Sequence, residues 1–362
     1  MPMMPTNKLP IMEGPVCPVP LRHGEQIVMG HGSGGRMTRD LIEKTFKPFL
    51  SSPPLAAGND FARVAANGSG ESGGRLAVST DSHIVTPLFF PGGDIGRLAI
   101  CGTVNDISMS GGVPLYLTAG FILEEGLQVE VLQQVLASMQ AAAAEAGVQI
   151  VAGDTKVVER GKADQLFINT AGIGWIPDSR QIGGEQAQHG DVVLISGAIG
   201  DHGIAVLSAR GELGFEADVR SDVAPLNGLI NAVLEAAPHT HVLRDPTRGG
   251  LATTLNEIAE QSRTAILLDE AKIPMHPAVR AACEMLGFDP LYVANEGKVI
   301  VIVPEAEADA ALLAMRNHKY GIEAVRIGVV QEAPAKRVLM RTLIGGTRIL
   351  DMLSGEMLPR IC

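Results

Sequence analysis

Aromatic residues are scarce in this chain of 362 residues, at 4%, and no long hydrophobic run interrupts the sequence. A membrane-spanning helix needs roughly 18 consecutive apolar residues, so none is predicted. A signal peptide is not predicted either, because no basic cluster precedes an apolar run near the start. We expect residues 1–22 to form a proline-rich extension. Its prolines are Pro2, Pro5, Pro10, Pro15, Pro18 and Pro20.

Cysteine is also rare, and basic residues are outnumbered. The four cysteines are Cys17, Cys101, Cys283 and Cys362. None belongs to a CxxC pair, which predicts a reduced, cytoplasmic protein without structural zinc. Forty acidic against 29 basic residues leave a formal net charge of −11, so we expect no nucleic-acid partner. A local pocket of backbone amides and metal ions can still bind a nucleotide on such a protein.

The length and the alternation of apolar patterns predict a two-domain α/β (α+β) protein. The polar, turn-rich segment Pro177–Gly190 is the expected boundary, which gives domains over residues 23–178 and 179–350 and a mobile tail over 351–362. The predicted strands are Arg75–Thr80, Val148–Ala152, Leu166–Ile176, Asp191–Ser196 and Lys298–Val303. The predicted helices are Met37–Phe46, Gly96–Met109, Val131–Ala146, His202–Arg210, Pro225–Ala236, Gly249–Gln261 and Glu305–Met315.

A glycine-rich loop runs from Gly30 to Gly35 and fits G-x-G-x-x-G between an expected strand and a helix. A dinucleotide-binding unit would need a second apolar strand soon afterwards, but Ser51–Gly58 is broken by prolines. A flexible loop that covers phosphate groups is the favoured interpretation, and a plain mobile loop is the alternative. The residues expected at the phosphate are Gly32, Ser33, Gly34 and Gly35.

Carboxylates stand beside apolar segments at four places. These residues are Asp60, Asp81, Asp106 and Asp154. Each alone is an ordinary turn or cap former, but together they favour a cleft that holds Mg²⁺, which prefers oxygen ligands and contacts substrate phosphates. Lys156 follows Asp154 by two residues and is suited to neutralise a γ-phosphate.

The remaining candidates are a glutamate, a terminal thiol and three histidines. Glu296 is either a general base or a turn carboxylate. Cys362 is the last residue, and its thiol is either a carrier that visits a pocket and a second protein or an accidental exposed cysteine. The histidines are expected in polar loops without a role. They are His31, His83 and His202.

Several motifs in order along the chain resemble the HypE family of hydrogenase maturation factors. They are His31–Gly35, Ser79–Ser82, Phe90–Gly96, Gly102–Asp106, Gly153–Val158, Gly200–Gly203, Asp245–Gly250 and Pro359–Cys362. Several also resemble the wider superfamily of aminoimidazole ribonucleotide synthetase, selenophosphate synthetase and thiamine-monophosphate kinase. The Pro-Arg-Ile-Cys ending is specific to the HypE family. One departure is Asn59 before Asp60, where the superfamily often has a second acid.

The resemblance implies a PurM-like architecture, in which the first domain joins its sheet to a partner's in a homodimer and ATP lies along that interface. It also implies that a carbamoyltransferase, HypF, loads a carbamoyl group onto the thiol of Cys362. ATP-dependent dehydration then gives a thiocyanate, and the cyano group passes to iron on a HypC–HypD complex.

The same resemblance implies roles for individual residues. Cys362 would be the carrier, Lys156 would stabilise the transferred phosphoryl group and Glu296 would accept amide protons. The nucleotide-binding residues beyond the glycine loop would be Thr80, Asp81, Asn105, Asp106, Gly153, Asp154, Thr155 and Lys156. Two alternatives stay open: an ATP-dependent synthetase or kinase of the same superfamily that acts on a free small molecule, and a non-catalytic thiol carrier.

Overall fold

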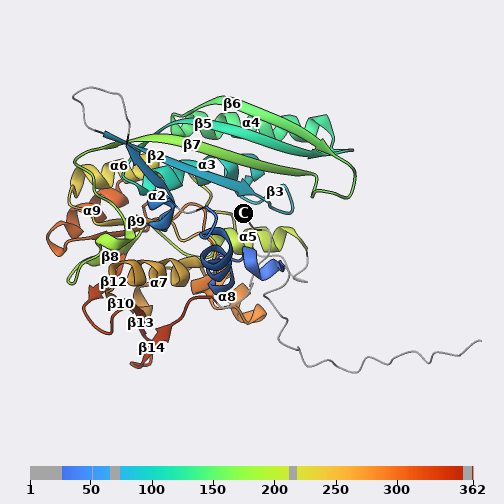
Figure 1. The fold of residues 1–362 in the computed structure, drawn as a ribbon. Coiled ribbons are helices and arrows are strands. Elements are labelled where there is room, and N and C mark those ends of the chain that lie inside the picture. Colours follow the sequence, from blue (N-terminus) through green and yellow to red (C-terminus); the bar gives the residue numbers. More distant parts are fainter. Residues whose placement is uncertain (1–26, 51, 66–73, 212–217, 354–360, 362) are drawn as a thin grey trace, which may run out of the picture.

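Two β-sheets organise the chain, one above the other in the view of Figure 1. The structure, a computed structural model, describes residues 27–50, 52–65, 74–211, 218–353 and 361. The extension expected over residues 1–22, most of the expected tail, and the cysteines at 17 and 362 lie outside the described residues. No helix in the described ranges is long and apolar enough to cross a membrane.

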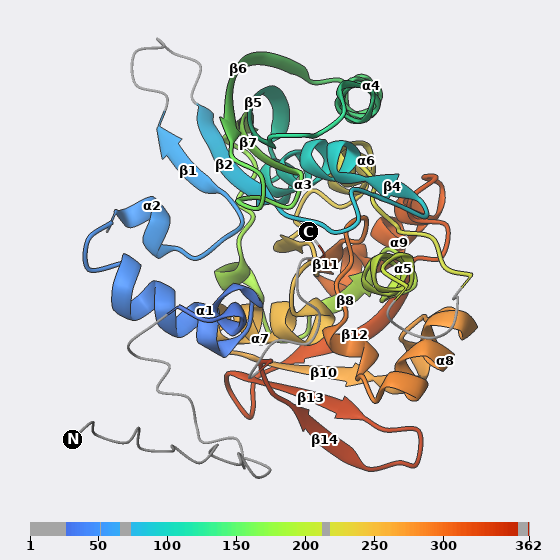
Figure 2. The same cartoon turned by 90° about the vertical axis from the view of Figure 1, so that its right-hand side faces the viewer.

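The first sheet has five strands in the order β1-β2-β7-β5-β6. They are β1 (Ala62–Ala65), β2 (Gly74–His83), β7 (Leu166–Pro177), β5 (Val113–Glu124) and β6 (Gln149–Val158). Only β5 and β6 pair in parallel. Figure 2 shows helices α3 (Ile95–Met109) and α4 (Val129–Ala146) on one side of this sheet. Because the other side is left uncovered, buried and accessible residues alternate along β7.

The second sheet has seven strands in the order β14-β13-β10-β12-β8-β11-β9. They are β14 (Thr347–Leu350), β13 (Arg337–Arg341), β10 (Ala265–Asp269), β12 (Val325–Gln331), β8 (Val192–Ile195), β11 (Ile300–Val303) and β9 (Val242–Arg244). Every residue of β8, β11 and β9 is buried, because helices pack on both faces. One face packs on α7 (Gly250–Ser262), and the other on α6 (Asn227–Ala236) and α9 (Ala308–Arg316). Continuous apolar strands are the sequence signature of this arrangement.

The remaining elements are short or peripheral. They are α1 (Arg36–Leu41), a π-helical turn (Ile42–Phe46), α2 (Pro53–Ala56), the hairpin β3 (Phe89–Phe90) and β4 (Gly93–Asp94), α5 (Asp201–Ala209) and α8 (Pro277–Leu286). Single 3-10 turns occur at Met29–Gly32, Gly184–Gln186, Glu270–Lys272, Pro290–Tyr292 and Glu305–Glu307.

Helix α3 lies between the two sheets (Figure 1). Its N-cap is Asp94, whose carboxylate accepts hydrogen bonds from the Gly96 and Arg97 amides. Thirteen of its residues are buried, which is why the apolar pattern of this helix wraps around most of its circumference. Met109, at its end, joins the core formed by α6 and the second sheet. The helix thereby fixes the two halves of the chain relative to each other.

The structure corrects four expectations about individual elements. No strand precedes the glycine loop within the described residues, and a 3-10 turn over Met29–Gly32 includes the start of that loop. Strand β2 continues through His83, so Asp81 lies inside a strand and not in a loop after it. Strand β6 is an exposed edge strand and not a buried one, and it includes Asp154 and Lys156. Strand β5, at Val113–Glu124, was not predicted.

Candidate functional site

A cavity of about 160 Å³ lies between the two halves of the chain and is lined mainly by carboxylates. Its lining residues are Asp60, Asp81, Ser82, His83, Gly102, Asp106, Asp245, Thr247, Arg248 and Glu296. We call the five acidic members, Asp60, Asp81, Asp106, Asp245 and Glu296, the acidic cluster. Three of them were predicted as metal ligands and one as a general base.

Each carboxylate reaches the cavity from a different element. Asp81 is on β2, Asp106 is on α3, and Asp245 directly follows β9. A close approach between β2 and α3 is required, and Gly102 permits it. A Cβ atom at Gly102 would lie 3.1 Å from Asp81 Oδ2 and 3.0 Å from His83 Cε1, closer than side chains normally allow.

Burial and mutual repulsion raise the pKa of several of these carboxyl groups. The pKa of Asp106 lies well above its ordinary value because the group is buried and because Asp81, Asp245 and Asp60 are nearby. The pKa values of Asp245 and Glu296 are raised well above normal for the same two reasons. Such a cluster favours the binding of protons or a cation, as expected for a functional site.

Arg244 partly neutralises the negative charge of the acidic cluster. Its buried guanidinium lies 2.6 Å from Asp60 Oδ2 and 2.5 Å from Glu257 Oε2. Even so, burial raises the pKa of Asp60 to about 6. Because Arg244 pairs with Asp60, the carboxylates of Asp81 and Asp106 are the more available oxygen ligands.

The residues predicted on β6 do not join the acidic cluster within this chain. Lys156 Nζ lies 2.5 Å from Asp154 Oδ2, and both side chains are exposed. This pairing lowers the pKa of the Asp154 carboxyl. The pair lines a neighbouring cavity of about 400 Å³ that shares Ser82 and His83 with the acidic one. Gly153 and Thr155 flank Asp154 on the same exposed strand.

Two predicted nucleotide contacts have other partners in the structure. The buried Asn105 amide donates to the carbonyl groups of Ala224 and Glu296, and its oxygen accepts from the Leu226 amide. The Asn105 side chain therefore positions the backbone of Glu296, and its contact with a nucleotide stays a prediction. Thr80 alternates with Asp81 along β2 and donates to the Thr170 carbonyl oxygen, so the two side chains lie on opposite faces.

The glycine loop contacts the acidic cavity through Arg248. The Arg248 guanidinium donates to the Gly32 carbonyl oxygen at 3.3 Å, and Arg248 also lines the cavity. The Ser33 hydroxyl donates to the Gly30 carbonyl oxygen at 2.8 Å, so it stabilises the loop itself. At Gly35 a Cβ atom would collide with the Leu353 carbonyl group.

Gly34→Ala should destabilise the loop, whereas Gly32→Ala should not. Gly34 has a φ of +77°, and a Cβ there would lie 2.9 Å from both Cβ and the carbonyl oxygen of Arg248. At Gly32, open space surrounds the Cβ position. We expect Gly34→Ala to lower the unfolding free energy by about 1–2 kcal/mol, and Gly32→Ala by less, as measured by urea denaturation. Equal losses for both variants would show that the Arg248 contact does not constrain the loop.

Two histidines expected in solvated loops are buried near the site. His83 is on β2 and 3% exposed, and it lines the acidic cavity. His202 is on α5 and fully buried, with Nε2 2.5 Å from the carbonyl oxygen of Ile361. The partners of His202, Ser221 and Ile361, are distant in sequence, so no local pattern indicated its burial. Asp245 was also missed as a site residue, although its motif had been noted.

The residues of the acidic cluster fit a hard divalent cation. Their oxygen atoms are the ligands that Mg²⁺ prefers, and Glu296 Oε1 is buried without a hydrogen-bond partner in the described part of the chain. Within that part, however, no three His, Cys, Asp or Glu side chains are arranged as a metal site. The chemistry of the donors fits, and Asp81 and Asp106 are the best-placed ligands.

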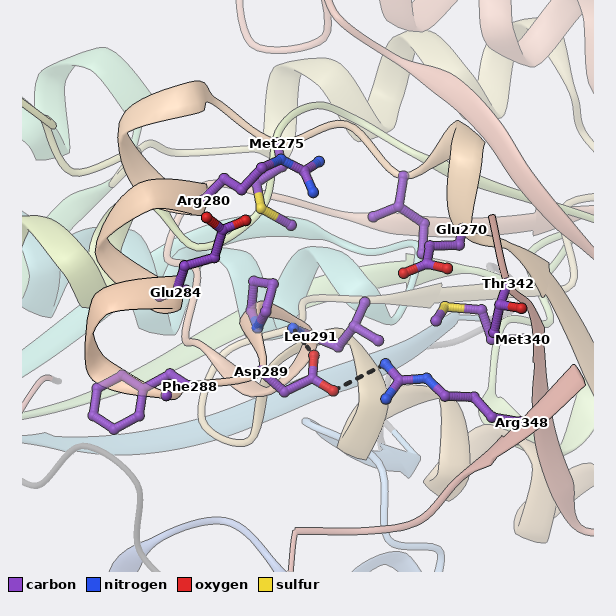
Figure 3. Close-up of a pocket in the computed structure, with 14 residues that line it drawn as sticks. Glu270, Met275, Arg280, Glu284, Phe288, Asp289, Leu291, Met340, Thr342 and Arg348 are labelled. Carbon is purple, nitrogen blue, oxygen red and sulfur yellow. Dashed lines mark hydrogen bonds and ion pairs between the residues drawn. The ribbon is translucent and has the colours of Figure 1, made fainter. Parts of the chain in front are cut away.

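A larger cavity, of about 560 Å³, lies at the edge of the second sheet (Figure 3). Figure 3 shows Arg280 and Glu284 of α8 on one side, with Met340 of β13 and Arg348 of β14 on the other. None of the acidic cluster lines it. Its charged groups are partly neutralised, since Arg348 donates to Asp289 at 2.9 Å. The smaller acidic cavity is therefore the stronger candidate for chemistry.

Two family models match the two halves of the chain. Residues 58–176 match the N-terminal domain of AIR synthase related proteins, and residues 188–341 match their C-terminal domain. A carbamoyl dehydratase HypE from Cupriavidus necator is 53% identical over 345 residues, which cover 95% of this chain and 97% of the relative.

Solved structures of HypE proteins resemble this chain over most of its length. A HypE–HypF complex contains a chain with a TM-score of 0.81 and 50% identity, which covers 86% of this chain and 99% of its own. A HypE structure in complex with ATP has a TM-score of 0.77 and 52% identity, and covers 93% and 100%. With two AIR synthase-like halves and about half of its residues shared over nearly the full length, this chain belongs to the HypE family of carbamoyl dehydratases.

Proposed function

We propose that this chain, a HypE carbamoyl dehydratase of hydrogenase maturation, carries a carbamoyl group on the Cys362 thiol and dehydrates it with ATP. The observation that supports this most directly concerns Ile361, the residue before Cys362. Ile361 is 5% exposed and bonded to His202, next to elements that carry the acidic cluster. The product, a thiocyanate, supplies the cyanide ligand of the [NiFe]-hydrogenase iron.

The reaction must turn an amide oxygen into a leaving group. The amide oxygen of S–C(=O)–NH₂ takes the γ-phosphoryl group of ATP, and ADP is released. Phosphate then leaves with that oxygen, and the nitrogen loses its two protons as S–C≡N forms. The net change is the loss of one water from the carbamoyl group, coupled to hydrolysis of ATP to ADP and phosphate.

Two residues have assigned roles besides Cys362. Lys156 would stabilise negative charge on the phosphoryl group. Its exposed position on β6 and its cavity shared with Ser82 and His83 support contact with a nucleotide that lies along that strand. Glu296 would accept an amide proton. Its buried Oε1, which has no hydrogen-bond partner among the described residues, supports a role in proton transfer. Burial and the neighbouring carboxylates raise the pKa of Glu296, which favours uptake of a proton.

We assign the cation to Asp81 and Asp106, with Asp60 as a further ligand. Asp154 would contribute a ligand from the side of the phosphate groups. When bound, Mg²⁺ would offset the negative charge of the phosphate groups. Asp60 must share its carboxylate with Arg244, as its 2.6 Å ion pair indicates. The glycine loop, Gly32 to Gly35, would cover the phosphate groups.

We propose further that two copies join through the uncovered face of the first sheet. Apolar side chains are exposed there, among them Tyr116, Ile122 and Ile173. Such a face favours protein association.

The proposed carbamoyl donor is HypF, and the proposed acceptor is a HypC–HypD complex that carries iron. The solved HypE–HypF complex supports the proposed donor. The domain boundaries at 178 and 350 and a cytoplasmic location remain part of this proposal.

Intact mass of the full chain tests the function. We expect a carbamoyl mass on Cys362 after incubation with the donor, and the loss of one water mass only after Mg-ATP is added. Cys362→Ala should show neither change, and Cys283→Ala serves as the control because Cys283 is buried away from the acidic cavity.

The same experiment separates the alternatives. A carbamoyl adduct that ATP leaves unchanged would support a non-catalytic carrier. ATP-dependent turnover of a free small molecule by Cys362→Ala, with no adduct on the unmodified chain, would support a synthetase or kinase.

A further inference from the structure

Ile361 is held in the core by its side chain and its backbone. The side chain packs in an apolar cluster that includes Val85, Phe90 and Val206. The backbone forms an isolated antiparallel bridge with Val85. Val85 and Ile361 are 276 positions apart in the sequence. The bridge between them therefore depends on the complete fold.

The polar partner of Ile361 is His202. Its Nε2 lies 2.5 Å from the Ile361 carbonyl oxygen, and its Nδ1 lies 2.8 Å from Ser221 Oγ. Because a carbonyl oxygen only accepts hydrogen bonds, Nε2 carries the proton and Nδ1 accepts from the Ser221 hydroxyl. Ser221 Oγ in turn accepts from the Val223 amide at 3.1 Å. The imidazole is thus held in one tautomer with both nitrogen atoms bonded.

The orientation of the ring is fixed as well. Phe90 packs edge-on to His202, with ring centroids 5.5 Å apart and an interplanar angle of 89°. His202 is fully buried on α5, and burial lowers its pKa, which favours the neutral form. The donor to Ile361 is therefore rigid.

The same elements adjoin the acidic cluster. Val85, which pairs with Ile361, follows His83 of the acidic cavity by two residues. Ser221 precedes Asp222, whose carboxylate accepts the Glu296 amide at 3.0 Å and pairs with Lys298 Nζ at 3.2 Å. His202, which holds Ile361, and Glu296, the proposed base, are thus connected by hydrogen bonds through the segment that contains Ser221 and Asp222.

We propose that His202 is a positioning residue that grips the backbone carbonyl of Ile361 and so presents Cys362 to the acidic cavity. Recognition of a main-chain carbonyl does not depend on what the thiol carries, so the free, carbamoylated and cyanated tails can all be held at this point. The proposal rests on the proposed function, because it assumes that Cys362 carries the reacting group.

The test compares His202→Leu, which removes the donor, with His202→Gln, whose amide can donate to the same carbonyl. The readouts are the alkylation rate of Cys362 by iodoacetamide, measured on the C-terminal peptide by mass spectrometry, and single-turnover dehydration of the carbamoylated chain. We expect His202→Leu to raise the alkylation rate and lower the dehydration rate by roughly tenfold each, as for loss of one buried hydrogen bond. His202→Gln should restore most of both rates.

The half-saturating ATP concentration should stay unchanged in both variants, since the tail contact does not involve the nucleotide. His239→Ala is the matched control, because this histidine is exposed and pairs with Glu307. If His202→Leu does not fold, Ser221→Ala replaces it; it removes the partner that fixes the tautomer and should also raise the alkylation rate.

Wild-type alkylation and dehydration rates in a folded His202→Leu would overturn the proposal. Failure of the proposed function looks different: the unmodified chain would then form no thiocyanate, while His202→Leu would still speed alkylation of Cys362.

Discussion

Replacing Asp106 by asparagine should slow dehydration of the carbamoyl group severely while leaving carbamoyl loading intact. Asp106 lies on α3 at the centre of the acidic cluster, and Asp81, Asp245 and Asp60 all raise the pKa of its carboxyl group. An amide keeps the shape of the side chain but removes the charge that a cation and its bound phosphates require. We expect a loss on the order of 10²–10³-fold in single-turnover dehydration, the size typical of one removed electrostatic contact.

Carbamoyl loading is expected to persist, because it requires an accessible Cys362 and the donor enzyme but not the acidic cluster. Intact mass before and after Mg-ATP measures both steps on the same sample. Asp309→Asn is the matched control, since Asp309 is exposed in the first turn of α9. Unchanged dehydration in Asp106→Asn would remove this carboxylate from the mechanism.

Asp106→Asn should also keep or raise the thermal midpoint in the absence of divalent cations. The substitution removes one of several buried carboxyl groups that repel one another, and an amide has no charge to desolvate. Inactivity together with undiminished stability would show that the acidic cluster is maintained for chemistry and not for folding.

Replacing Arg244 by methionine should produce the largest loss of stability. The guanidinium is buried and lies 2.6 Å from Asp60 and 2.5 Å from Glu257. Removing it leaves the Asp60 carboxylate uncompensated inside the protein, which should lower the free energy of unfolding by about 3–5 kcal/mol. Urea denaturation should show this loss as a lower midpoint. Because Arg244 also holds Asp60 at the cavity, dehydration should fall too.

Two further variants separate the loss of charge pairing from the loss of packing. Arg326→Met removes a guanidinium that pairs with Glu305 at 2.9 Å on the surface, and should cost about 0–1 kcal/mol. Asp60→Asn added to Arg244→Met should recover a large part of the lost stability, because the unpaired charge disappears. If the double variant is no more stable than Arg244→Met, the cost comes from packing and not from the unpaired carboxylate.

Strands β8 and β11 were predicted from the sequence, whereas the equally buried β9 and the partly exposed β5 were not. Strands β8 and β11 are continuous apolar runs, since helices cover both faces of their sheet. Strand β5 was missed because exposed apolar residues such as Tyr116 obscure its alternation. The exposure of β6 was likewise not predicted, because its exposed Val151 and Val157 are as apolar as core residues.

The site was predictable to the extent that its residues follow strand ends or local motifs. Asp81 and Asp106 stand in such motifs, and the structure brings both to one cavity. The burial of His202 was not predictable, because its partners are Ser221 on another segment and Ile361 near the end of the chain. The pairing of Asp60 with Arg244 likewise joins residues far apart in sequence.

The docking of Ile361 has a consequence for the order in which the protein matures on the ribosome. Residues synthesised from the N-terminus onward can fold as they emerge, and Ile361 is synthesised long after Val85 and His202. The contacts of Val85 and His202 with Ile361 are therefore among the last to form, and their wide sequence separation makes them slow as well.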